Sequence, residues 1–376
     1  MLKKSPYLKF LILSIAYLLV SLFLVALIHY PNLADERAGV IQLTNFDGYK
    51  PFQYRMLMPL FLRGIEFLTP EVIENKIAGF LRPNILERMG RHDVADYKVE
   101  LVKDYTFRVV LYVGLNTLML LSFMFAIRKL AGLFDYFPDT FNDLLPLGLV
   151  VIIPIFYNFP NYSHDFSHLL LFTLGLYYMY QQNWLPYIII FALAIINKET
   201  AVMLAVVYFY FFKGLMPQKP FYKILTVQLA LFAVIKSILS FTLPNNPGVF
   251  LESHLKGNLQ HLADISNYFR FEPLEKGTLL PSAVNIPLPA NLNLPMLAII
   301  VFLIAYAWSA KPLFLRKSMI YFPLLVIIGM FFGNIFELRS FYDFLPIVYL
   351  LSLMGIYRIY QNMTVGSMKI QTEKPG

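Results

Sequence analysis

The chain has 376 residues, of which 58% are hydrophobic, 16% aromatic and only 14% charged. In soluble proteins roughly a quarter of the residues are charged. The composition therefore excludes a soluble protein and indicates an all-α integral membrane protein. The net charge is +8, and many of the Lys and Arg residues that produce it lie beside apolar runs, where they set membrane orientation. It therefore does not indicate nucleic-acid binding. Because the chain has no cysteine, disulfides and thiolate metal sites are excluded.

The apolar runs predict about ten membrane helices in a single domain that covers 1–376. The first run is flanked by lysines and lacks a small-residue cleavage site, so we interpret it as an uncleaved span and not as a signal peptide. The predicted helices lie at 8–28, 105–127, 144–159, 167–181, 186–196, 200–212, 222–243, 295–310, 319–333 and 341–357.

Two of these runs, 186–196 and 200–212, are too short to cross a ~30 Å membrane core at ~1.5 Å per residue. They form either a pair of half-helices or one long helix interrupted at 197–200. With a pair, the later basic loops and both termini face the cytoplasm, as the positive-inside rule requires. With one long span, those loops face outside, so we favour the pair.

Two long loops then face outward from the inner (plasma) membrane. The first, 29–104, contains a mixed apolar and charged run at 51–68. This run predicts a helix that lies in the membrane interface and bends at Pro59. The second loop, 244–294, is rich in Pro and Asn and predicts an irregular cover over the outer end of the bundle.

Four polar clusters are expected at this outward face. Placing charged side chains beside membrane spans costs free energy. Four charged clusters at the same depth of the membrane therefore indicate a binding site. The clusters are Asp47 with Tyr54 and Arg55; His164, Asp165 and His168; Asn197, Lys198 and Glu199; and Glu337 with Arg339.

The first two clusters each have a functional and a local interpretation. Asp47 is either a general base, with Arg55 as an anion partner, or a turn residue in a solvated loop. His164 and His168 share one helix face. That spacing can hold a metal, but without a further clear ligand we expect no metal and favour bonds to a phosphate oxygen or sugar hydroxyl. Asp165 alternatively stabilises the positive end of a helix dipole.

Residues 197–200 interrupt an apolar run, where an ionised group costs about 2.5–3.5 kcal/mol at mid-span. A helix break near the interface lowers this cost and presents backbone N–H groups to a ligand. The alternative is a Lys198–Glu199 pair at a turn, although adjacent side chains on a helix diverge by about 100°.

The last cluster is Glu337 and Arg339, which would face different ways on a helix. The local alternative to a role in the site is an ion pair between Arg339 and Asp343, which are four residues apart at a helix start. Glu337 has no local partner, and a distant cation such as Lys198 or Arg55 would then pair with it. Lys236 either snorkels or reaches the same cavity.

These features resemble the GT-C membrane glycosyltransferases of bacteria. The resemblance is carried by Asp47-Gly48-Tyr49, the stretch 51–55, Asn197-Lys198-Glu199-Thr200 and Glu337-Leu338-Arg339. It implies that Asp47, the acid of the first outward loop, is the catalytic base. Many members carry two acids close together there, whereas this chain has Asp47 alone, with Asp35 and Glu36 farther away.

The resemblance implies sugar transfer from a polyprenyl-phosphate donor to a glycan, lipid or protein acceptor during cell-envelope assembly, without a cofactor. The leaving phosphate would be stabilised by Lys198, Arg339, Arg55 and His164, and the other cluster residues would help bind substrate. Alternatives are an O-antigen-type polymerase or ligase, a lipid or solute transporter, and a scaffold without catalysis.

Cysteine labelling tests the predicted orientation. If the half-helix pair forms, Thr200→Cys and Lys213→Cys lie at opposite membrane faces, so impermeant thiol reagents should label them from opposite sides. The native chain has no cysteine and provides an unreactive background. Labelling of both positions from one side would exclude the pair.

Overall fold

The computed structural model describes residues 6–28, 35–90, 96–156, 162–249, 251–273, 287–290 and 292–372. The protein is mostly helical (79%). Within the described residues, five helices are long and apolar enough to cross a membrane, which suggests a multi-pass membrane protein. These are Pro6–Leu27, Thr106–Gly132, Gln218–Thr242, Leu313–Phe332 and Leu338–Thr364. The expected total of about ten membrane helices stays a prediction, because the other apolar helices are shorter.

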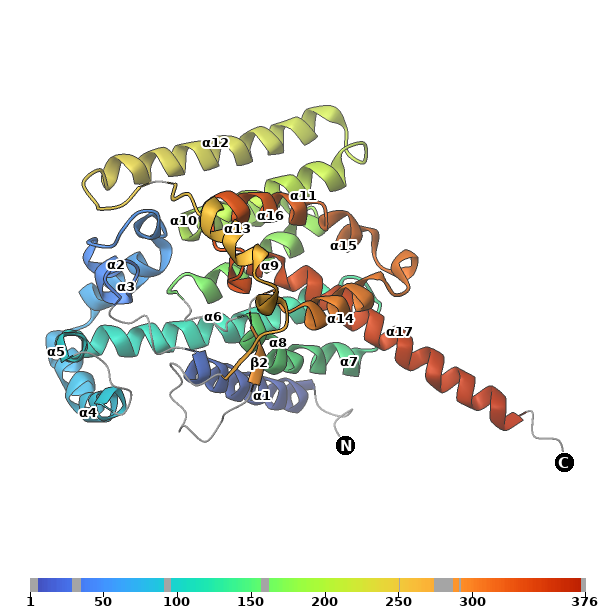
Figure 1. Cartoon of the computed structure of the whole chain (residues 1–376), viewed down its shortest axis with the longest axis horizontal. Helices are drawn as coiled ribbons and strands as arrows, with labels where there is room; N and C mark the ends of the chain where they lie inside the picture. The colour runs from blue at the N-terminus through green and yellow to red at the C-terminus, as the bar shows by residue number, and fades with distance from the viewer. Residues whose placement is uncertain are drawn as a thin grey trace.

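Three of the longest helices run along the long axis of the molecule: α1 (Pro6–Ile28), α6 (Thr106–Gly132) and α12 (Gln218–Thr242) (Figure 1). The elements of the first loop gather at one end, whereas the last helix, α17 (Leu345–Thr372), extends toward the other end (Figure 1). The first-loop elements are α2 (Val40–Asn45), η2 (Phe52–Tyr54), α3 (Leu57–Leu68), α4 (Glu71–Gly90) and α5 (Asp96–Asp104).

The remaining elements form the middle and the C-terminal part of the chain. The middle of the chain forms α7 (Asp139–Leu144), η3 (Leu145–Gly148), α8 (Leu149–Phe156), α9 (Asp165–Tyr180), α10 (Trp184–Asn197), η4 (Glu199–Val202) and α11 (Met203–Phe212). After α12 come α13 (Leu255–Ala263), η5 (Ile265–Tyr268), β1 (Phe271–Pro273), β2 (Pro287–Pro289), α14 (Leu294–Ala305), η6 (Trp308–Ala310), α15 (Leu313–Ser318), α16 (Tyr321–Phe332), η7 (Leu338–Phe344) and α17 (Leu345–Thr372).

Helices α10 and α11 form a hairpin that reverses at Lys198. The ring of Trp184, at the start of α10, lies 5.7 Å from that of Tyr208 and 5.4 Å from that of Phe212, at the end of α11. The start of one helix therefore packs beside the end of the other. The structure thus contains two short helices in a hairpin and not one continuous helix; their place as half-helices within a membrane stays a prediction.

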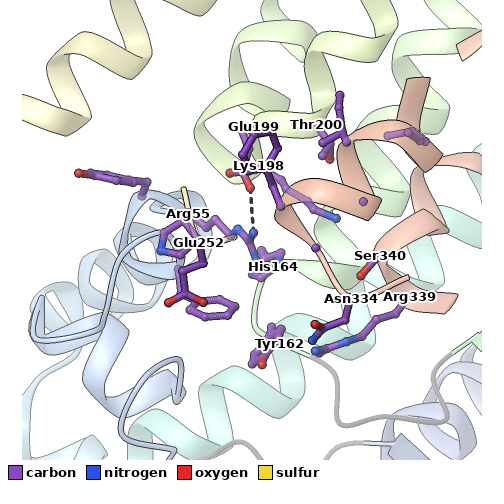
Figure 2. A pocket seen from close by; sticks show the side chains of 18 of the residues that line it. Arg55, Tyr162, His164, Lys198, Glu199, Thr200, Glu252, Asn334, Arg339 and Ser340 are labelled. Atoms are coloured by element: carbon purple, nitrogen blue, oxygen red, sulfur yellow. Dashed lines mark hydrogen bonds and ion pairs between the residues drawn. The ribbon is translucent and has the colours of Figure 1, made fainter. Parts of the chain in front are cut away.

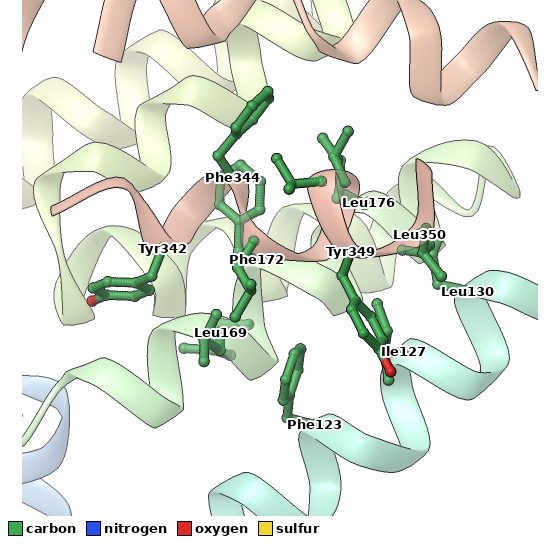
Figure 3. Close-up of a cluster of buried hydrophobic side chains, with 14 of the residues drawn as sticks. Phe123, Ile127, Leu130, Leu169, Phe172, Leu176, Tyr342, Phe344, Tyr349 and Leu350 are labelled. Carbon is green, nitrogen blue, oxygen red and sulfur yellow. The ribbon is translucent and has the colours of Figure 1, made fainter. Parts of the chain in front are cut away.

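The apolar core lies where α6, α9, η7 and α17 meet. Phe123 and Ile127 of α6 face Leu169 and Phe172 of α9, and Tyr349 of α17 closes the cluster (Figure 3). All of these side chains are buried. Because this contact fixes the start of α9 against η7, it also fixes the polar residues that precede or follow these elements.

Two loop predictions differ from the structure. The segment 51–68 is not one helix bent at Pro59; it breaks after Tyr54, and α3 begins at Leu57. Pro59 thus lies in the first turn, where its missing N–H costs no helical hydrogen bond. The loop 244–294 contains α13 and an antiparallel β1–β2 pair where an irregular segment was predicted.

Tight packing between α14 and α17 generates a stability prediction. A Cβ added at Gly355 would lie 2.1 Å from the backbone oxygen of Leu303, and backbone cannot move as freely as a side chain. Gly355→Ala should therefore destabilise the protein by about 1–3 kcal/mol, measured by thermal unfolding in detergent.

Gly114→Ala on α6 is the matched control for this substitution. The added Cβ would meet nothing within 4 Å, so the higher helix propensity of alanine should leave stability equal or slightly raised. Equal midpoints for the two variants would contradict the close α14–α17 contact.

Candidate functional site

The predicted polar residues converge on a cavity of about 420 Å³. Its walls come from η2, the turn before α9, η4, α12, residues 251–254, α16 and the segment 333–342 (Figure 2). The predicted site residues that line it are Tyr54, Arg55, His164, Asp165, Lys198, Glu199, Glu337 and Arg339. Asp47, His168 and Asn197 do not line it.

Arg55 and Glu199 form the central ion pair of the cavity (Figure 2). Arg55 Nη2 donates to Glu199 Oε1 over 2.8 Å, and Lys236 Nζ lies 3.7 Å from Glu199 Oε2. Lys236 thus reaches the cavity. Lys198 has extended backbone angles (φ −160°, ψ 138°), and Glu199 pairs with these more distant cations.

His164 is held neutral between cations. Arg55 Nη1 lies 2.9 Å from His164 Nε2, and because arginine only donates, Nε2 accepts and the proton resides on Nδ1. Burial lowers the pKa of His164 well below its usual range, and the neighbouring Arg55 and Lys198 charges lower it further. His164 therefore acts as a hydrogen-bond partner at neutral pH and carries no charge.

Asn197 is a structural residue of the site. Its Oδ1 accepts from Ser167 Oγ at 2.7 Å and its Nδ2 donates to the backbone oxygen of His164 at 2.9 Å. The backbone N–H of Met56 also donates to the oxygen of Ile196, over 3.0 Å. These bonds join the helix break to both the α9 start and the first loop, so Asn197 positions ligand-facing residues without facing the cavity.

Lys198 rests on Tyr342 and Asp343, a contact that the sequence did not predict because its helical spacing paired Asp343 with Arg339. Its Nζ lies 4.0 Å from the centre of the Tyr342 ring and 4.0 Å from Asp343 Oδ1. Asp343 also contacts Nε2 of His168, and both side chains are fully buried. His168 therefore belongs to the support of Lys198, behind the cavity wall.

Glu337 and Arg339 pair with each other, contrary to the expected Arg339–Asp343 pair. Arg339 donates through Nε and Nη2 to Glu337 Oε2, over 3.0 and 2.6 Å. The expectation assumed an α-helix, but Glu337 is extended and η7 has 3-10 geometry, which brings the two side chains together. The Arg339 guanidinium also stacks on Tyr162 at 4.0 Å (Figure 2).

The second loop contributes a further charged group that sequence reasoning missed. Glu252 pairs with Arg37 of the first loop, and Glu252 Oε2 lies 3.4 Å from His254 Nε2. All three line the cavity. They lie in segments without helical periodicity, so the sequence held no spacing signal for them.

Asp47 is exposed and lies on the turn between α2 and η2. Its backbone N–H donates to the oxygen of Gln42 over 3.0 Å, and its side chain does not line the cavity. Its role as the base stays a prediction. Asp165 is buried, and its Oδ2 accepts from the Tyr162 N–H over 2.8 Å, so it orders the turn before α9. Among the described residues, no group of three or more metal-ligating side chains is present.

The buried, neutral His164 predicts a loss of stability in acid. The unfolded chain takes up a proton near the ordinary pKa of 6.5, whereas the folded protein does so only at lower pH. Below about pH 6.5 the unfolded state therefore binds more protons, and unfolding becomes easier by up to about 1.4 kcal/mol per pH unit.

His164→Gln, which keeps an acceptor for Arg55, should flatten this part of the pH dependence. The measurement is the thermal midpoint in detergent between neutral pH and pH ~5. Identical slopes for the variant and the native protein would contradict a neutral His164.

Comparisons with known proteins identify no relative. No family model matches the chain, and no curated protein or solved structure is significantly similar to it.

Proposed function

We propose that this protein is a membrane glycosyltransferase that moves a sugar from a polyprenyl-phosphate donor to an extracytoplasmic acceptor. The observation that carries the proposal is the cavity, in which basic side chains from separate segments meet an apolar wall. The basic residues are Arg37, Arg55, Lys198, Lys236 and Arg339. The apolar wall includes Val202, Met203, Phe232, Leu325, Ile328 and Phe332.

Lys198 is the group best suited to the leaving phosphate. Arg55, Lys236 and Arg339 each face a cavity carboxylate. Among the described residues, the nearest carboxylate oxygen to Lys198 Nζ is 4.0 Å away, beyond hydrogen-bonding distance. Its N–H groups are therefore available to a phosphate oxygen, and a fixed cation stabilises the charge that develops as the sugar–phosphate bond breaks.

The apolar wall suits the lipid part of the donor. Phe232 on α12 and Leu325 and Ile328 on α16 line the cavity beside the charged groups. The outer faces of these helices expose further apolar side chains, including Val234 and Ile327. A prenyl chain placed here would stay in an apolar environment while its phosphate reaches Lys198, which avoids desolvating the phosphate in hydrocarbon.

A gene-removal experiment tests the proposal. Cells without the gene should lose one sugar modification of a surface glycan or glycolipid and accumulate its lipid-linked donor, both measured by mass spectrometry. Cells that carry Lys198→Gln should show the same change, because transition-state stabilisation of the phosphate is lost.

Lys219→Gln, on the exposed start of α12, removes a lysine of the same charge away from the cavity and should leave the glycan unchanged. Unaltered glycans and lipid-linked sugars after gene removal would contradict the proposal. Movement of a substrate across the membrane without a new glycosidic bond would indicate a transporter.

A further inference from the structure

Glycosyl transfer requires a group that accepts the proton of the attacking hydroxyl. Asp47 does not line the cavity, and two of the carboxylates that do are poorly suited to this task. Glu199 faces both Arg55 and Lys236, and Glu337 accepts from Arg339 and from Asn334 Nδ2, the latter over 2.7 Å. Charged or polar donors already occupy the oxygens of both carboxylates, so an incoming proton would have to displace these donors.

We propose that His254 is the general base of this site and that Glu252 is its positioning residue. The proposal rests on the proposed glycosyl transfer. His254 lines the cavity, and its side chain is 32% exposed, so a hydroxyl can reach it and it can release a proton to water. His254 Nε2 lies 3.4 Å from Glu252 Oε2, so a proton on Nε2 would face this carboxylate and leave the lone pair of Nδ1 free.

The backbone around His254 is fixed on two sides of the cavity. The His254 N–H donates to the oxygen of Phe331 in α16 over 2.9 Å. On the other side, Asn246 Nδ2 donates to the oxygens of Phe46 and Gly48 over 2.7 and 2.9 Å. These bonds join the second loop to the first loop and to α16, and the bond to Phe331 fixes the backbone at His254.

Gly248 permits the close approach of these two loops. Its φ is +87°, and a Cβ at this position would lie 2.7 Å from the backbone oxygen of Lys50. The Lys50 N–H meanwhile donates to the oxygen of Pro247 over 2.8 Å. The contact therefore requires glycine, and it sets the path of the chain that leads to Glu252 and His254.

In the proposed transfer step, one bond to the anomeric carbon forms as another breaks. The acceptor oxygen forms a bond to the anomeric carbon and gives its proton to His254 Nδ1. The bond from the anomeric carbon to the phosphate oxygen breaks, and its electron pair stays on the polyprenyl phosphate beside Lys198. The imidazolium, stabilised by Glu252, later releases its proton to water.

Variants of His254 test the proposal in membranes from the cells that carry the modified glycan. His254→Gln should lower the rate of product formation by about 10²- to 10⁴-fold, while binding of undecaprenyl phosphate to the purified protein is unchanged. His254→Ala should recover part of its activity when imidazole is added, which a purely structural role would not produce. Glu252→Asp should retain more activity than Glu252→Gln.

Lys256→Gln, two residues away on the exposed face of α13, is the matched control and should transfer sugar at the normal rate. Thermal midpoints show whether each variant is folded. Normal transfer by His254→Gln, or a folded His254→Ala that imidazole does not rescue, would overturn the assignment of the base. Absence of any glycan change on gene removal would overturn the proposed function and the base together.

Discussion

The site depends on the reversal of the chain at Lys198. A helix that ends within an apolar bundle leaves backbone carbonyls without partners, which is costly unless other groups bond to them. Here the N–H of Met56 bonds to the carbonyl of Ile196, and the Asn197 side chain reaches the start of α9. The bonds that make the break stable are therefore the same ones that bring the first loop and α9 to the cavity.

The charges of the cavity are arranged so that each stabilises another. Arg55 touches Glu199 and His164, and Arg339 touches Glu337. Removing one member of a buried pair leaves an uncompensated charge and costs more than the pair contributes. Such a network holds its members rigidly, which suits the proposed stabilisation of a leaving phosphate.

The sequence was a good guide where a residue broke a periodic pattern. Lys198 and Glu199 interrupt an apolar run, and the structure indeed places a helix break and cavity residues there. The sequence was a poor guide to which charged side chains form ion pairs. Arg339 and Asp343 satisfied a helical spacing rule, but the segment is extended and 3-10, so Arg339 pairs with Glu337 instead.

The second loop shows why long-range contacts were not predictable. Glu252 reaches Arg37, and Asn246 reaches Phe46, across about two hundred residues of sequence. Loop residues without a period of 2 or 3.6 give no signal of the face they occupy. Only the folded chain shows that the second loop completes the wall of the cavity.

This division of the cavity wall suits a transfer between a lipid and a more polar acceptor. Helices α12 and α16 supply apolar side chains to the wall, whereas the two loops supply Arg37, Glu252 and His254. A lipid-bound donor entering from the helices and a hydroxyl entering past the loops would meet between them. The phosphate that leaves the sugar would then face Lys198, and the attacking hydroxyl would face His254, which can accept its proton.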